Sequence, residues 1–168
     1  FDRARASVTL IDSDGDGDAE VAVGVPGVAG SEPGAVYVVD PRSSGDLQRA
    51  SSEASVAGRS SGDHIGERLT AADLDGDGLQ DLTIGASAAT ATSGGYGLVS
   101  TFFGPLTSHR YIDDAGQVVE GDADSRGFGD VLVSCDVDGD GREELLVGAD
   151  FDSRLYSEQG ALYAFRGG

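Results

Sequence analysis

A nine-residue acidic stretch that occurs three times is the feature that most constrains the fold of this chain. The middle copy reads Asp-Leu-Asp-Gly-Asp-Gly-Leu-Gln-Asp and covers residues 73–81. The other copies begin at Asp12 and Asp136, so the three first positions are 61 and 63 residues apart. A short apolar run follows each copy at once. Self-similarity at a nearly fixed spacing indicates a repeated structural unit of about 60 residues.

The residue types within each stretch predict a binding site for a hard cation. Carboxylates stand at positions one, three, five and nine, and glycines at positions four and six allow the backbone to curl through positive φ. Ca2+ takes about 6–8 oxygen ligands, including backbone carbonyls. We therefore predict about three Ca2+ ions, each held by these carboxylates and by the carbonyl of position seven. The predicted ligands are Asp12, Asp14, Asp16, Asp18 and Glu20; Asp73, Asp75, Asp77, Leu79 and Asp81; and Asp136, Asp138, Asp140, Arg142 and Glu144.

Two alternatives to this calcium loop fit the sequence less well. An EF-hand needs a bidentate Glu at position twelve and a helix on each side. Position twelve is Val23, Ile84 or Val147, and short β-type runs follow each stretch. Solvated acidic turns are the simpler alternative, but a turn requires neither four carboxylates nor fixed spacing. The pattern therefore favours cation sites.

The charge of the chain limits its partners. It contains 30 acidic and 11 basic residues, for a net charge of −19, and 14 of the acids lie in the three stretches. Nucleic acids and anionic lipids both require basic surface, so neither is expected as a partner. No apolar run is long enough to cross a bilayer, which predicts no membrane insertion. The absence of Met and of a signal peptide predicts a processed or excised piece.

Short strand patterns recur in each unit, and they predict an all-β fold. We expect one domain over 1–168, divided into units at about 1–58, 59–121 and 122–168. Each complete unit has about four strands, and the third unit stops before its fourth. The expected strands are 7–11, 21–25, 35–39 and 54–57; 68–72, 82–86, 98–103 and 117–120; and 131–135, 145–149 and 161–165. Residues 40–52 and 151–159 are expected to be surface loops.

These units resemble the FG-GAP repeats of integrin α-subunit propellers and their bacterial relatives. That pattern has a Phe-Gly pair, an acidic calcium loop and then Gly-Ala-Pro. Phe128-Gly129 matches the first element and Ile65-Gly66 nearly does, whereas the first unit has Ala4-Arg5 there. The last element is degraded in all three units, as Gly24-Val25-Pro26, Gly85-Ala86-Ser87 and Gly148-Ala149-Asp150.

The resemblance implies a β-propeller with about three four-stranded antiparallel blades. Propellers close with ~4–8 blades, and this family uses about seven, so the chain is expected to form an arc. Further blades of the parent chain or self-association would then cover its ends. The resemblance also implies an extracellular or cell-surface location, and adhesion to a protein or glycan ligand without catalysis. An accessory propeller of a secreted hydrolase or lyase is the alternative.

The sequence predicts no catalytic residues. Ser61, Asp63 and His64 contain the letters of a hydrolase triad, but residues so close in sequence rarely point together. No nucleophile elbow surrounds them. We therefore predict that this chain is not an enzyme.

Overall fold

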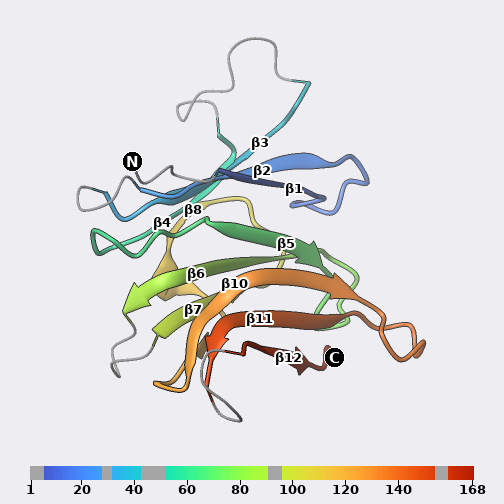
Figure 1. Cartoon of the computed structure of the whole chain (residues 1–168). Coiled ribbons are helices and arrows are strands. Elements are labelled where there is room, and N and C mark those ends of the chain that lie inside the picture. The colour runs from blue at the N-terminus through green and yellow to red at the C-terminus, as the bar shows by residue number, and fades with distance from the viewer. Residues whose placement is uncertain (1–5, 28–31, 43–51, 91–95, 154–158) are drawn as a thin grey trace.

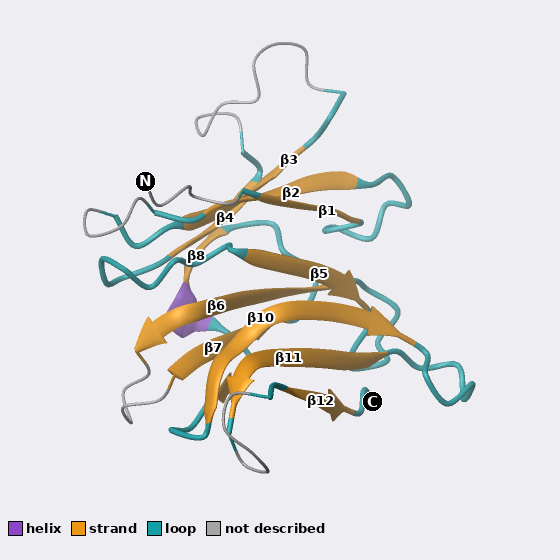
Figure 2. Ribbon diagram, viewed as in Figure 1, coloured by secondary structure: helices purple, strands orange, loops and turns teal. Residues whose placement is uncertain are grey.

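A computed structural model of the chain is all-β and consists of three sheets arranged side by side (Figures 1 and 2). It describes residues 6–27, 32–42, 52–90, 96–153 and 159–168. The predicted all-β fold, with three antiparallel blades of a propeller that does not close, is confirmed.

Each sheet takes its strands in chain order, and all of them except β8 come from a single unit. The first contains β1 (Ser7–Ile11), β2 (Glu20–Val25), β3 (Ala35–Val39), β4 (Ala54–Ala57) and β8 (His109–Tyr111). The second contains β5 (Arg68–Ala72), β6 (Asp81–Thr90), β7 (Tyr96–Phe102) and β9 (Gln117–Glu120). The third contains β10 (Ser125–Cys135), β11 (Glu144–Asp152) and β12 (Ala161–Phe165).

The eleven strands expected from sequence are all present, but two details differ from the prediction. Strands β6, β10 and β11 are longer than expected, and β11 takes in Phe151 and Asp152, which were assigned to a loop. The short strand β8 was not predicted. It comes from the second unit but pairs in parallel with β4 of the first sheet, so it ties the two sheets together.

The larger core lies between the first and second sheets. Alternate residues of each strand point to this interface, which is why β2 and β4 alternate between buried and half-buried positions. Complete burial of a large apolar side chain contributes about 1.5–3 kcal/mol. The fully buried members with the largest side chains are Ile11, Ile65, Leu82, Ile84, Phe102 and Leu106.

A smaller core lies between the second and third sheets and is centred on Phe128. The Phe128 ring packs edge-on against Tyr163, with centroids 5.4 Å apart, and against Phe165, with centroids 6.3 Å apart. Val99 of the second sheet and Val147 of the third belong to the same buried cluster. Edge-to-face pairs of this kind add about 0.5–1.5 kcal/mol to the burial of the rings. The Phe of the Phe-Gly pair is thus a packing residue between blades.

Two glycines set the distance between neighbouring sheets. A Cβ on Gly85 of β6 would lie 2.5 Å from the carbonyl oxygen of Gly129 in the third sheet. The same relation holds one unit earlier, where a Cβ on Gly24 would overlap the carbonyl oxygen of Gly66. The glycine after the first and the second apolar run therefore lets the next unit's backbone approach closely.

The first strands of adjacent sheets lie next to one another. Thr70 Oγ1 of β5 is 2.9 Å from Ser134 Oγ of β10, and Arg68 pairs with Asp130 at 2.9 Å. Ser7 of β1 donates a hydrogen bond of 2.7 Å to the Gly66 carbonyl. These contacts place β5 between β1 and β10 (Figure 1).

The two end sheets each have one apolar face that no described sheet covers. Val8 and Leu10 of β1 are both 64% exposed. At the other end of the arc, Leu162 of β12 is 66% exposed and Val131 of β10 is 49% exposed. In the register of the third sheet, Val131 pairs with Gly148 and Gly148 with Leu162, so these residues share a face. The middle sheet, in contrast, is covered on both sides.

Candidate metal centres

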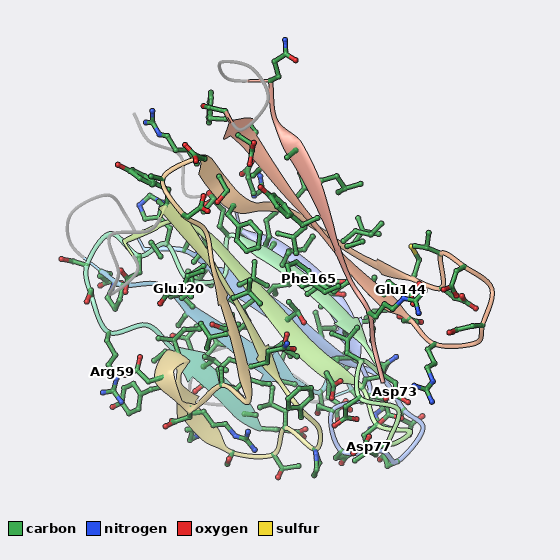
Figure 3. All side chains as sticks on the ribbon, turned by 90° about the horizontal axis from the view of Figure 1, so that it is seen from below. Arg59, Asp73, Asp77, Glu120, Glu144 and Phe165 are labelled. Carbon is green, nitrogen blue, oxygen red and sulfur yellow. The ribbon has the colours of Figure 1, made fainter. Side chains whose placement is uncertain are left out.

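The three acidic stretches form loops of the same kind at the same end of the molecule. They connect β1 to β2, β5 to β6, and β10 to β11, and all three project from one side of the sheets (Figure 1). Figure 3 labels Asp73 and Asp77 on the second loop and Glu144 on the third, all on that side. The fold thus converts the sequence repeat into three loops at corresponding positions.

The carboxylate at position one organises each loop. In the second loop, Asp73 accepts hydrogen bonds from the backbone N–H groups of Gly76 and Gly78, at 2.7 and 2.9 Å. Both glycines have positive φ, of 78° and 89°, which side chains with a Cβ rarely adopt. The equivalent bonds occur at Asp12 and Asp136. The glycines are therefore required by the curl of the loop.

The carboxylate at position nine closes each loop. Asp81 accepts hydrogen bonds from the N–H of Leu74, at 2.8 Å, and of Gly104, at 3.0 Å. Glu20 and Glu144 accept the bond from position two in the other loops, at 2.9 Å each. All three side chains are buried, because each residue begins the strand that follows its loop.

The structure brings together the carboxylates of positions one, three and nine in every loop. Within each group, one oxygen of every member lies within 4.8 Å of an oxygen of the others. Separations of this size suit a single cation that binds all three. The groups are Asp12, Asp14 and Glu20; Asp73, Asp75 and Asp81; and Asp136, Asp138 and Glu144.

The carboxylates of position five do not belong to these groups. Asp16, Asp77 and Asp140 instead each accept a hydrogen bond from the backbone N–H of position seven, at 2.8, 2.8 and 2.9 Å. Their role as ligands, and that of the carbonyls of Asp18, Leu79 and Arg142, remains a prediction. The side chain of Asp18 pairs with Arg42 at the surface, as expected for a residue that would bind only through its backbone.

The charges of the second loop fit a divalent cation. Burial raises the pKa of Asp81, and the nearby Asp75 and Asp73 carboxylates add to the increase. Within the described part of the chain, no cationic side chain pairs with any of these three residues. Like charges held this close repel one another, and a bound cation would offset that repulsion. The donor set consists of oxygen only, which favours Ca2+ or Mg2+ over softer metals.

The third loop has an ion pair at one of its predicted carboxylate ligands. Arg166, near the end of the described chain, lies 3.3 Å from the carboxylate of Asp138. Both side chains are well exposed, so the pair is weak in water. It nevertheless places a positive charge beside a predicted ligand.

Away from the loops, a contact that the sequence did not predict joins two polar residues of the first sheet. The pairing of β4 with β8 brings Ser55 Oγ to 2.9 Å from Nδ1 of His109. Among the described residues, no carboxylate orients this imidazole. His64 lies in a turn with φ of 57°, and within the described structure its ring bonds to neither a serine nor an aspartate. Neither histidine forms an organised triad.

Substitution of Asp14 and Asp18 tests the assignment of ligands within a single loop. Asp14→Asn keeps the oxygen that accepts the 3.1 Å bond from the Asp16 N–H but removes one charge from the cluster. We expect Ca2+ to bind the first loop roughly tenfold more weakly or worse, with no loss of stability in EDTA. Isothermal titration calorimetry with Ca2+ measures the affinity.

The matched control is Asp18→Asn, which removes the same charge from position seven of the same loop. Its side chain lies outside the cluster, so we expect the Ca2+ affinity to change by about twofold at most. Equal losses from the two substitutions would show that total charge, and not the ligand set, determines binding.

Comparison with known proteins agrees with the fold and the loops. A sequence model of the FG-GAP repeat matches residues 65–102 and 128–165. Each matched segment begins at the apolar residue of the Ile-Gly or Phe-Gly pair, includes an acidic loop and ends at the third strand of its sheet. The chain is also 30% identical to integrin alpha-PS2 of Drosophila melanogaster, over 96% of this chain and 11% of that protein. This chain therefore carries two FG-GAP repeats and is similar to an integrin α subunit over most of its length.

Proposed function

We propose that this chain is a calcium-stabilised part of an extracellular or cell-surface β-propeller that binds a protein or glycan ligand and performs no catalysis. The observation that carries this proposal is the set of three carboxylate clusters, each at the same position in its sheet. Ca2+ bound there would hold the end of each sheet in one conformation. The opposite end would then present its loops as a rigid surface.

The likeness to an integrin α subunit supports a binding role rather than a catalytic one. The chain spans only about a tenth of that protein, so the ligand of the whole molecule is itself part of the proposal. None of the described helices is both long and apolar enough to cross a membrane. The exposed faces at Val8 and Leu162 are consistent with further blades or with a second copy of the chain.

A binding screen with and without Ca2+ tests this function. The chain is immobilised at one end and exposed to arrays of extracellular-matrix proteins and glycans, first in about 1 mM Ca2+ and then in EDTA. We expect binding that EDTA abolishes, and no hydrolysis of ester, peptide or polysaccharide substrates. Turnover that is lost in His109→Ala, with folding intact, would contradict the non-catalytic assignment.

A further inference from the structure

A cavity between the first and second sheets lies outside the metal loops. Its volume is about 490 Å3, within the ~300–1,000 Å3 range of small-molecule sites. Its walls come from the segment after β4, from β6, β7 and β9, and from the short 3-10 helix Ile112–Asp114. Figure 3 places Arg59 and Glu120, which line the cavity, on the opposite side of the molecule from Asp73 and Asp77. The cavity is therefore separate from the predicted cation sites.

The floor of this cavity carries a hydroxyl group without a partner. Ser100 of β7 is fully buried, and within the described structure its Oγ has no hydrogen bond. A buried hydroxyl left unsatisfied is unfavourable, so native proteins seldom retain one without a water or a ligand. Ile112 and Ala89, also buried, form the apolar part of the floor.

The strand register directs the Ser100 side chain toward the cavity. Ser100 pairs with Val118 of β9, and Leu98, two residues earlier in β7, pairs with Glu120. These four residues share one face of the sheet, because alternate residues of a strand point to the same side. All four line the cavity. Val99, between Leu98 and Ser100, belongs instead to the core on the other face.

The rim of the cavity carries both donors and acceptors. The Arg59 guanidinium pairs with Asp113 and lies over the Tyr111 ring, 4.2 Å from its centroid. Asp63 accepts a hydrogen bond from the backbone of Ser60 at 3.0 Å, which fixes the turn that carries it. A guanidinium fork and several carboxylates around one opening can meet a ligand that has hydroxyl groups on more than one side.

The combination of floor and rim favours a neutral ligand with several hydroxyl groups. An anion would be repelled by a chain of net charge −19 and by the carboxylates of the rim. An alkylammonium ion would keep its charge at the rim, because burial of the charge on the apolar floor is costly. Its aliphatic part would then leave Ser100 unsatisfied. A sugar ring can offer hydroxyl groups both to the rim and to Ser100, and it presents C–H groups to Leu98 and Ile112.

We propose that the cavity between the first and second sheets binds a single neutral sugar residue, with Ser100 as the hydrogen-bonding group at its floor. Arg59 donates to the sugar, Asp63 and Asp113 accept from its hydroxyl groups, and Leu98 contacts its apolar face. This proposal rests on the binding function proposed above and names the ligand class and the site.

The test is an NMR titration of the whole chain in Ca2+ with methyl glycosides of mannose, galactose and glucose as probes. At about 10 mM probe, an affinity on the order of 1 mM would saturate most of the sites. We expect at least one probe to shift the backbone amide signals of β7, β9 and residues 59–63. Glucosamine and glucuronate are the charged probes, and we expect neither to bind more tightly than the neutral sugar.

Ser100→Ala is the decisive variant, because removal of an unpartnered hydroxyl should not lower the melting temperature. We expect this substitution to weaken binding of the sugar about tenfold. The control is Ser87→Ala, which lies in a separate cavity and bonds to Glu67, and we expect it to bind the sugar normally. Absence of any shift, equal affinity in Ser100→Ala, or tighter binding of glucosamine would each overturn the proposal.

These experiments distinguish failure of the sugar site from failure of the proposed binding function. If the chain binds an array ligand in Ca2+ but no sugar in this cavity, the proposed binding function is supported and the proposed sugar site is contradicted. Sugar binding that depends on Ser100 but persists in EDTA supports the cavity and rejects calcium control of ligand binding.

Discussion

Ca2+ is expected to raise the melting temperature of this protein by several degrees for every loop that it occupies. A ligand that binds only the folded state contributes about 2.7 kcal/mol when its concentration is 100-fold above its Kd. For a chain of this size, each kcal/mol corresponds to roughly 2–4 °C. The physical cause is the repulsion among three carboxylates in each cluster, which a cation removes. Differential scanning calorimetry in Ca2+ and in EDTA measures the shift.

Mg2+ is the matched control for this experiment. It requires a tighter octahedron of oxygens and releases its water reluctantly, so we expect it to stabilise the protein much less than Ca2+ does. Equal stabilisation by both ions would indicate charge screening rather than loops that fit one ion.

The stabilisation by Ca2+ should also depend on pH. Burial raises the pKa of Asp81 above its ordinary 3.8, so protons compete with the cation as the pH falls toward this raised pKa. In EDTA, with no Ca2+ bound, the stability contributed by Asp81 changes with pH in the opposite direction. The folded state then holds the Asp81 proton more tightly than the unfolded state does, so the contribution of this residue to stability decreases as the pH rises through the same range.

Gly85→Ala is expected to destabilise the protein by about 1–3 kcal/mol or more, through overpacking between the second and third sheets. The new Cβ would lie 2.5 Å from the Gly129 carbonyl oxygen and 3.1 Å from the Leu132 side chain. Because the first contact is with backbone, the sheets must separate to relieve it. Urea denaturation of the variant and the wild type in Ca2+ measures the change in the free energy of unfolding.

The repeat provides a matched control in the third sheet. Gly148 occupies the position of Gly85, but the nearest atoms that a Cβ there would meet belong to Val131 of its own sheet, the closest at 3.0 Å. Val131 is 49% exposed and can move, so we expect Gly148→Ala to cost clearly less than Gly85→Ala. Equal losses would show that the glycine is needed for the conformation of its own strand and not for the approach of the next sheet.

Much of this architecture could be predicted because its signals are local. The nine-residue spacing fixes the Asp and Gly positions of each loop, and apolar alternation indicates the strands that follow. The predicted curl of the second loop is confirmed by the positive φ of Gly76 and Gly78. The positions that form each three-carboxylate group were also among the predicted ligands.

The features that were missed depend on contacts between distant residues. Strand β8 carries no strong pattern of its own, and it forms because it pairs with β4, more than fifty residues earlier in the chain. The partner of His109 could not be predicted for the same reason. The cavity at Ser100 arises from the packing of two sheets, and a serine in an apolar strand gives no sign of it. The repeated glycine after each loop was visible in the sequence, but its cause, the close approach of Gly129 to Gly85, was not.

The number of Ca2+ ions bound per chain tests the central claim most directly. Native mass spectrometry of the chain at micromolar-range Ca2+, repeated after EDTA, counts the ions without reference to any ligand. The three equivalent clusters predict three ions, with the first and second loops filled before the third, where Arg166 lies beside Asp138. A chain that binds no Ca2+, or that binds one ion regardless of substitutions in the loops, would contradict the account.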